Sequence, residues 1–192
     1  MLLGACMCGC LDEPTCEDGE YRDLTWGTAS QAAGVDLSTL IDQLDGRYTL
    51  RLGPALLGAE RPGGYGFPLT LDASARLDED PRQYLPPSER GGSCGGFLEL
   101  PSEMQMRADT TEPPWRLVSV DMTYYDHLYV EVVLEVETDG GVTVLRGTMG
   151  LSDSGVHLRQ MVFFTDPHAP YEAPVGELLS DEQCAPIPVE EC

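Results

Sequence analysis

The sequence contains no lysine and no asparagine, and all 11 of its positively charged side chains are arginines. Without a lysine, neither a Walker-type phosphate loop nor a Schiff-base amine can be built. A genome rich in G and C explains both missing residue types, because their codons are poor in these bases. We therefore expect a GC-rich bacterial source and exclude two common classes of catalytic site.

Positive charge is scarce overall. Against the arginines stand 33 aspartates and glutamates, which gives a formal net charge of −22. Such a surface repels phosphate, so we expect no nucleic-acid partner and no attraction to an anionic membrane face. A surface adapted to salt is a second explanation of this charge. The 192 residues, with 42% apolar side chains, suit a single globular domain.

Four of the seven cysteines lie in the first sixteen residues, at Cys6, Cys8, Cys10 and Cys16. The stretch Leu3-Gly4-Ala5-Cys6 resembles the lipobox of bacterial lipoproteins, and the acidic LDEPTCEDGE that follows is typical of a tether. The resemblance implies lipid attachment at Cys6, with Cys10 as the second candidate. A metal site is the alternative, but structural zinc sites usually space a pair of ligands by two to four residues. A plain truncated signal without lipid, or free cytosolic thiols, is the remaining alternative.

If Cys6 carries lipid, six cysteines remain, an even number suited to disulfides in an oxidising compartment. We expect disulfides among Cys16, Cys94, Cys184 and Cys192, and all three pairings of these four stay open. Closing such long loops contributes about 3–5 kcal/mol in the entropic account. The predicted location is the cell envelope, in the periplasm or at the outer membrane or cell surface.

Apolar residues first follow a helical period and then a period of two. Asp36 is placed to cap a short helix ending at Leu44, because leucines and isoleucine recur at helical spacing behind it. Alternation then predicts half-buried strands. These strand-like runs lie at 46–52, 67–77, 97–108, 118–122, 127–137, 142–151 and 156–164. The stretches TDGG at 138–141 and LSDSG at 151–155 are hairpin signals.

These elements predict an all-β fold, either a single antiparallel β-sandwich or a small β-barrel, with one short N-terminal helix and irregular termini. Residues 1–20 are assigned to a signal remnant and lipid-anchored acidic tether. Residues 21–165 form the helix and the β domain, and residues 166–192 form a Pro-rich acidic tail held by cysteines. Residues 53–66 and 109–114 are expected to be loops.

Candidate catalytic residues are few. Ser93 stands in G-x-S-x-G, but a strand-like run follows it where a nucleophile elbow requires a helix. His127, His157 and His168 lack the spacing of metal ligands, and the first two are expected to face solvent. Acidic stretches such as LDEDP at 77–81 do not match a calcium loop. We predict no catalytic residue, no cofactor and no metal.

Aromatic side chains gather at Tyr124, Tyr125 and Tyr129, with Trp115 nearby in sequence. At strand positions such residues are more often core or cross-strand pairs than the mouth of a ligand site.

The stretch Leu44-Asp45-Gly46-Arg47-Tyr48, placed after a short helix, is similar to the start of lipocalin-type barrels. The main prediction is a monomeric, non-catalytic binding or structural module. Lipid holds it at the membrane, and its ligand is an unidentified protein or small molecule. The resemblance implies the alternative, a lipocalin-like carrier of a small apolar ligand, and a hydrolase using Ser93 is the third reading.

Overall fold

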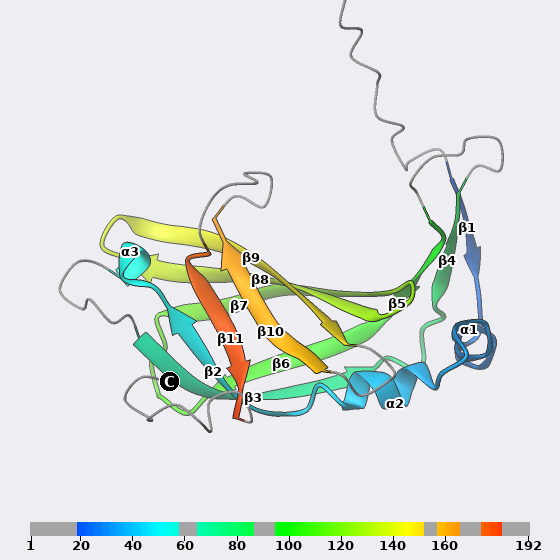
Figure 1. Ribbon diagram of the computed structural model, residues 1–192, viewed down its shortest axis with the longest axis horizontal. Coiled ribbons are helices and arrows are strands. Elements are labelled where there is room, and N and C mark those ends of the chain that lie inside the picture. Colours follow the sequence, from blue (N-terminus) through cyan, green and yellow to red (C-terminus); the bar gives the residue numbers. More distant parts are fainter. Residues whose placement is uncertain (1–18, 58–64, 87–94, 152–156, 166–173, 182–192) are drawn as a thin grey trace, which may run out of the picture.

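The computed structural model describes residues 19–57, 65–86, 95–151, 157–165 and 174–181. Eleven strands form one antiparallel sheet that curls on itself, and short helices lie at its margins (Figure 1). The helices are α1 (Trp26–Ala33), α2 (Leu37–Asp42) and α3 (Pro54–Leu57). The strands are β1 (Glu20–Asp23), β2 (Gly46–Leu52), β3 (Tyr65–Ala75), β4 (Arg82–Leu85), β5 (Phe97–Leu100), β6 (Ser102–Ala108), β7 (Trp115–Tyr124), β8 (Leu128–Thr138), β9 (Gly141–Leu151), β10 (His157–Phe164) and β11 (Gly176–Ser180).

The strand pairings follow one curled sheet that stays open between β6 and β7. From β7 the order runs through β8, β9, β10, β11, β2 and β3 to β6, which is an edge strand. Only Pro101 separates β6 from β5, and β5 pairs back onto β7. Because most sequential strands lie side by side along this curled sheet, it has the up-and-down order of a small barrel. The all-β prediction with a single antiparallel sheet is thus confirmed, and the curl resembles a barrel more than a sandwich.

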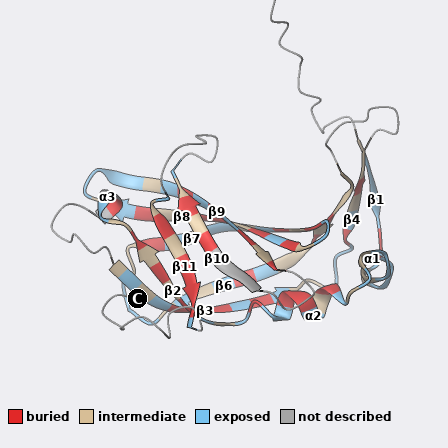
Figure 2. Ribbon diagram, viewed as in Figure 1, coloured by how far each residue is buried: buried red, intermediate tan, exposed pale blue. Residues whose placement is uncertain are grey.

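The inner face of the sheet carries the core. Along β8, the alternation places Leu128, Val130, Val132, Leu134 and Val136 inside, each at most 1% exposed. Figure 2 shows such buried residues along the strands and along α2. This alternation arises because successive side chains of a strand point to opposite faces.

Gly147 of β9 makes room for the core. It lies opposite Phe163 of β10, which is fully buried. A Cβ atom at Gly147 would stand 2.7 Å from a ring carbon of Phe163. The glycine therefore leaves the room on β9 that the Phe163 ring occupies.

Helix α2 begins as predicted at Asp36, whose carboxylate accepts hydrogen bonds from the backbone N–H groups of Ser38 and Thr39. Its apolar face joins the core through Leu37, Leu40 and Ile41. The segment between α2 and β2 is fixed by a hydrogen bond, which the Tyr48 hydroxyl donates to the Leu44 carbonyl at 3.0 Å. The helix thus covers the end of the barrel where β2 begins.

The structure corrects several sequence-based boundaries. Helices α1 and α3 and strands β1 and β4 were not expected. Strand β11 lies inside the predicted tail 166–192, so assigning that whole segment to an irregular tail is wrong. Leu178, Leu179 and Ser180 of β11 are buried, and the strand pairs with both β10 and β2. A run of five residues is too short to show a period, which explains the error.

The predicted strand around Val118 also needs a correction. A bulge between Leu117 and Ser119 shifts the register of β7 against β8. Val118 is therefore 47% exposed, although the simple alternation with Met122 places it inside.

Candidate functional site

A single proline divides one predicted strand into two. The run 97–108 becomes β5 and β6, with Pro101 between them. Before the proline, Leu100 pairs with Met122 of β7; after it, Ser102 pairs with Ala75 of β3. Proline has no N–H for the ladder and is found where pairing ends or changes. The chain therefore changes partner at this point.

This change of partner opens the side wall of the barrel. No ladder joins β6 to β7 anywhere in the described strands. At the point of divergence a pocket of about 540 Å³ lies between β5, β7 and the turn after β3. We call it the side-wall pocket. The residues that line it are Arg76, Glu79, Asp80, Arg82, Glu99, Leu100, Pro101, Ser102, Val120, Asp121, Met122 and Thr123.

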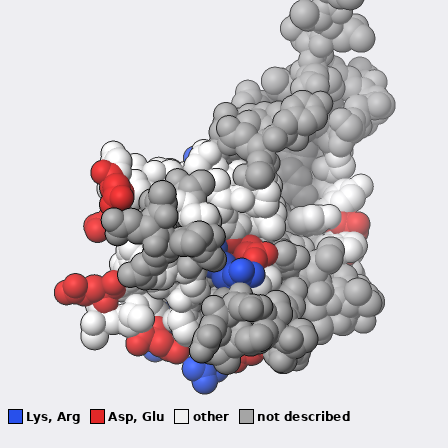
Figure 3. Space-filling view, turned by 60° about the vertical axis from the view of Figure 1, so that its left-hand side comes forward, with Lys and Arg blue, Asp and Glu red and all other residues white. Residues whose placement is uncertain are grey.

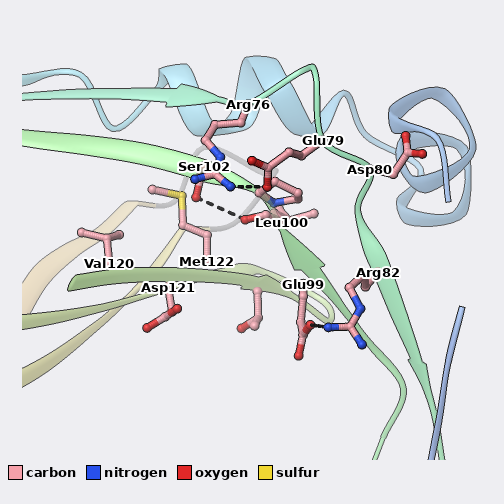
Figure 4. A pocket seen from close by; sticks show the side chains of 12 residues that line it. Arg76, Glu79, Asp80, Arg82, Glu99, Leu100, Ser102, Val120, Asp121 and Met122 are labelled. Atoms are coloured by element: carbon pink, nitrogen blue, oxygen red, sulfur yellow. Dashed lines mark hydrogen bonds and ion pairs between the residues drawn. The ribbon is translucent and has the colours of Figure 1, made fainter. Parts of the chain in front are cut away.

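The floor of the side-wall pocket is apolar. Leu100 and Met122 belong to the core and are 5% and 3% exposed, and Val120 is half-buried beside them. Figure 4 shows Val120 and Met122 pointing from β7 toward Ser102 and Arg76, while Asp121 points to the other side of the strand. The core thus reaches the surface here under a polar rim.

One part of that rim is a turn fixed from helix α1. The Trp26 indole N–H donates to the backbone carbonyls of Arg76 and Glu79, at 3.3 and 2.8 Å. The Arg76 guanidinium forms an ion pair with the Glu79 carboxylate, and this hydrogen bond raises the pKa of Arg76. The turn is thus held by the Trp26 hydrogen bonds to its backbone and by the ion pair between its own side chains, and it forms a defined wall of the pocket.

A second part of the rim is Arg82 of β4. Its guanidinium lies 3.6 Å from the Glu99 carboxylate and 4.3 Å from the centre of the Tyr21 ring. Tyr21 meets Tyr84 edge to face at 5.3 Å, and Tyr84 stacks on Phe97 at 4.9 Å. These aromatic contacts join β1, β4 and β5, which project from the barrel beside α1 (Figure 1).

The pocket carries an excess of negative charge. Four carboxylates, of Glu79, Asp80, Glu99 and Asp121, stand against the guanidinium groups of Arg76 and Arg82, so the formal charge of the lining is −2. Both arginines already have carboxylate partners. Asp80 and Asp121 are exposed, and neither has an ion-pair partner in the described ranges.

Acidic groups also stand out elsewhere on the surface. Figure 3 shows several separate groups of carboxylates on the face turned forward, with less arginine between them.

A second polar cluster occupies the turn between β7 and β8. The Asp126 carboxylate accepts a hydrogen bond from the Tyr129 hydroxyl at 3.1 Å. His127 Nδ1 also lies 3.1 Å from Asp126 Oδ1, but it has no hydrogen-bond partner within the described ranges. Burial alone raises the pKa of Asp126, but the bond from Tyr129 and the neighbouring His127 outweigh it, and the net pKa is lowered. Burial and the Asp126 carboxylate raise the pKa of Tyr129.

The predicted aromatic cluster is divided in the structure. Tyr125 and Tyr129 are 59% and 42% exposed on this turn. Trp115 and Tyr124 are buried at opposite ends of β7, about 30 Å apart at the usual rise per residue. Trp115 therefore does not join the tyrosines.

Most residues singled out from the sequence lie outside the described residues. These are Cys6, Cys10, Cys16, Ser93, Cys94, His168, Cys184 and Cys192. Strand β5 begins shortly after Ser93, at Phe97, as the sequence predicted. The His127 side chain is 37% exposed, and His157 begins β10. No three His, Cys, Asp or Glu side chains lie together as metal ligands in the part of the chain that the structure describes.

Comparison with known proteins gives no relative: no family model, curated protein or solved structure matches this chain. None of the helices within the described ranges has the length and apolar character needed to cross a membrane.

Sequence reasoning did not find the side-wall pocket. The one signal was Pro101 inside an otherwise regular strand pattern, which marks a break but not the partners on each side.

Proposed function

We propose that this protein is a non-catalytic binding module of the bacterial cell envelope, held by lipid on Cys6, and that it binds its ligand in the side-wall pocket. The lipobox-like Leu3-Gly4-Ala5-Cys6 and the acidic stretch after it support the anchor. A ligand could bind either inside the barrel or in the side-wall pocket, and two observations favour the side-wall pocket.

The first and decisive observation is the packing of the barrel interior. Leu134 of β8, Leu145 of β9, Met161 of β10 and Leu50 of β2 are all 0% exposed. A side chain with no accessible surface leaves no room beside it for a water molecule, and still less for an apolar ligand. Around these residues the barrel is a filled core, as in other small barrels.

The second observation is the side-wall pocket itself. Its volume of about 540 Å³ lies within the usual range of roughly 300–1,000 Å³ for small-molecule sites. It combines an apolar floor with a charged rim, since six of its twelve lining residues are Arg, Asp or Glu, and it is therefore more polar than most such sites. Its walls are held by the Trp26 hydrogen bonds and by the strand pairings of β5.

The anchor is tested by intact mass of the protein purified from membranes of a native or closely related host, with and without reduction. We expect a diacylglyceryl or triacyl increment on a chain beginning at Cys6. Cys6→Ala should release the protein into the soluble fraction, whereas Cys10→Ala, the matched control, should leave it in the membrane. A full-length chain without lipid and with free thiols would overturn the anchor.

A lipocalin-like carrier is the second candidate, because the curled sheet follows a short helix and its strands keep the up-and-down order of such barrels. The two tryptophans of the chain separate the candidates. Trp115 belongs to the core, whereas Trp26 donates to two carbonyls of the pocket wall. A ligand inside the barrel changes Trp115 fluorescence, which Trp26→Phe isolates. A ligand in the side-wall pocket changes Trp26 fluorescence, which Trp115→Phe isolates.

A further inference from the structure

We propose that the edge strand β6 pairs with β6 of a second copy of this chain, so that two curled sheets join into one antiparallel sheet across a two-fold axis. The inference goes beyond the proposed function and does not depend on a ligand in the side-wall pocket. It departs from the monomer that the sequence predicts. Three features of β6 support it: its free backbone groups, its lack of edge protection and the self-complementary order of its side chains.

Strand β6 has a neighbouring strand on only one side. Among the described strands it pairs with β3 alone, and it ends the strand order of the sheet. At one end of this ladder the Asp109 N–H donates to the Pro68 carbonyl, two residues that lie opposite each other in the same register. Because an antiparallel ladder bonds every second residue, the residues of β6 that bond to β3 are Glu103, Gln105 and Arg107. The remaining residues direct their N–H and C=O groups to the open edge, and these are Ser102, Met104, Met106 and Ala108.

Strand β6 also lacks the features that usually protect an edge strand. Protected edges are commonly short, bulged, interrupted by proline or charged on their inward face. β6 has seven residues in an unbroken register, contains no proline and carries no charge on its inward face. β1, at the other end of the strand order, has only four residues, all of them exposed and three of them charged. Of these two edges, β6 is therefore the one suited to a further strand.

The side chains of β6 are complementary to themselves. The sequence SEMQMRA is nearly symmetric about Gln105. When two copies run antiparallel about this residue, Glu103 stands opposite the partner's Arg107 on the outer face. On the inner face, Met104 stands opposite the partner's Met106.

The same register suits the backbone. The charged pairs fall at non-hydrogen-bonded positions, where facing side chains lie closest, and the methionine pairs fall at hydrogen-bonded positions. Opposite charges and apolar side chains placed across a pair of strands both stabilise the pairing. One register thus matches the charges, the apolar side chains and the free backbone groups.

Both charged side chains are available for this contact. Glu103 is exposed and has no ion-pair partner in the described ranges. The Arg107 side chain is 66% exposed. It contacts Asp72 and Gln105 through Nε and Nη2, which leaves Nη1 without a partner within the same ranges. The seven residues of β6 carry no net charge in a chain of −22, so the strand itself adds nothing to the repulsion between two copies.

Pairing would also cover apolar surface at the open edge. The inward side chains of β8 are at most 1% exposed, whereas Met106 and Ala108 of β6 and Leu117 of β7 are only half-buried. At the other end of β6, the side-wall pocket lies between Ser102 and Val120 (Figure 4). The partner's Ala108, whose side chain is a single methyl group, would stand beside Ser102, so the end of the partner strand has room there.

Sedimentation velocity of the full chain tests the proposal, with Cys6→Ala in every sample so that neither lipid nor detergent adds to the mass. We expect a dimer at about 100 μM, a concentration that detects even weak association. A non-reducing gel identifies any dimer that is linked by a disulfide instead.

Charge reversal tests the register. Glu103→Arg sets two arginines opposite each other and Arg107→Glu sets two glutamates opposite each other, so each variant should weaken the dimer about tenfold or more. An equal mixture of the two variants should form a dimer again, because every charged pair across the mixed interface has opposite signs. Glu20→Arg, the matched control on the edge strand β1, should leave the dimer unchanged.

A backbone variant tests the strand pairing itself. Met106→Pro removes an N–H that points to the open edge and leaves the ladder with β3 intact, so it should abolish the dimer while the chain stays folded. Met106→Ala, the matched control, keeps this N–H and should keep the dimer. Thermal melts check that both variants are folded.

Three results would overturn the inference. The first is a Cys6→Ala chain that is monomeric at about 100 μM. The second is a dimer that keeps its affinity in Glu103→Arg and Arg107→Glu, because its interface would then lie elsewhere. The third is a mixture of these two variants that stays monomeric, because the register about Gln105 would then be wrong. The ligand site is tested separately by Trp26 and Trp115 fluorescence and survives any of these results.

Discussion

The packing of the barrel interior makes a prediction about Leu134→Ala. Leu134 lies in the middle of β8, is 0% exposed and belongs to the core. The substitution removes three carbon atoms, which at about 0.8 kcal/mol each accounts for about 2.4 kcal/mol of lost transfer free energy. The cavity left in a filled core adds to this, so we expect a loss of about 3–5 kcal/mol in the free energy of unfolding.

Urea denaturation followed by tryptophan fluorescence measures this difference, and a thermal melt should shift by on the order of 10 °C. Val142→Ala on β9 is the control, because Val142 is 63% exposed, and its free energy of unfolding should change by less than about 0.5 kcal/mol. A loss below about 1 kcal/mol for Leu134→Ala would refute the argument. It would mean that the interior has spare room, and the carrier candidate would then gain support.

Two further predictions concern local features of the fold. Gly147→Ala brings a Cβ atom against the buried Phe163 ring and should cost about 1–3 kcal/mol of stability by urea denaturation. Gly140→Ala, where the nearest atom is 3.8 Å away, should cost less than Gly147→Ala. Asp36→Ala removes the cap of α2 and should cost about 1 kcal/mol at pH 7. The hydrogen bond from Ser38 lowers the folded pKa of Asp36, so this contribution is present above its unfolded pKa and should vanish as the pH falls through the folded pKa. An Asp36→Ala difference that persists at pH 2 would contradict this.

The sequence predicts the strands and their buried residues well where a strand is long and one of its faces is exposed to solvent. Strands β3 and β8 have eleven residues each, and their alternation predicts which residues are buried. Strands β4 and β11 have four and five residues, too few to show a period. The bulge that exposes Val118 inserts one extra residue into β7, so the inward and outward positions change places there. Nothing in the local sequence marks this shift.

The side-wall pocket depends on contacts between distant residues, and local patterns do not encode these. Arg76 and Ser102 both line the pocket because they lie next to Pro101, where the chain stops pairing with β7 and starts pairing with β3. Trp26, far away in sequence, then fixes the turn. The sequence marks Pro101 as an interruption, but the partners on its two sides follow only from the way the whole sheet curls. The lipid anchor and the disulfides, in contrast, remain predictions from the sequence alone.

The pairing of β2 with β11 has a consequence for how the protein is made. Tyr48 lies opposite Ser180, so β2 cannot complete its pairing before β11 has been synthesised. Until then one edge of β2 stays open, and such distant pairings form slowly. During synthesis this open edge can pair with a strand of another chain, so the same topology that builds the curled sheet exposes the nascent chain to misassembly.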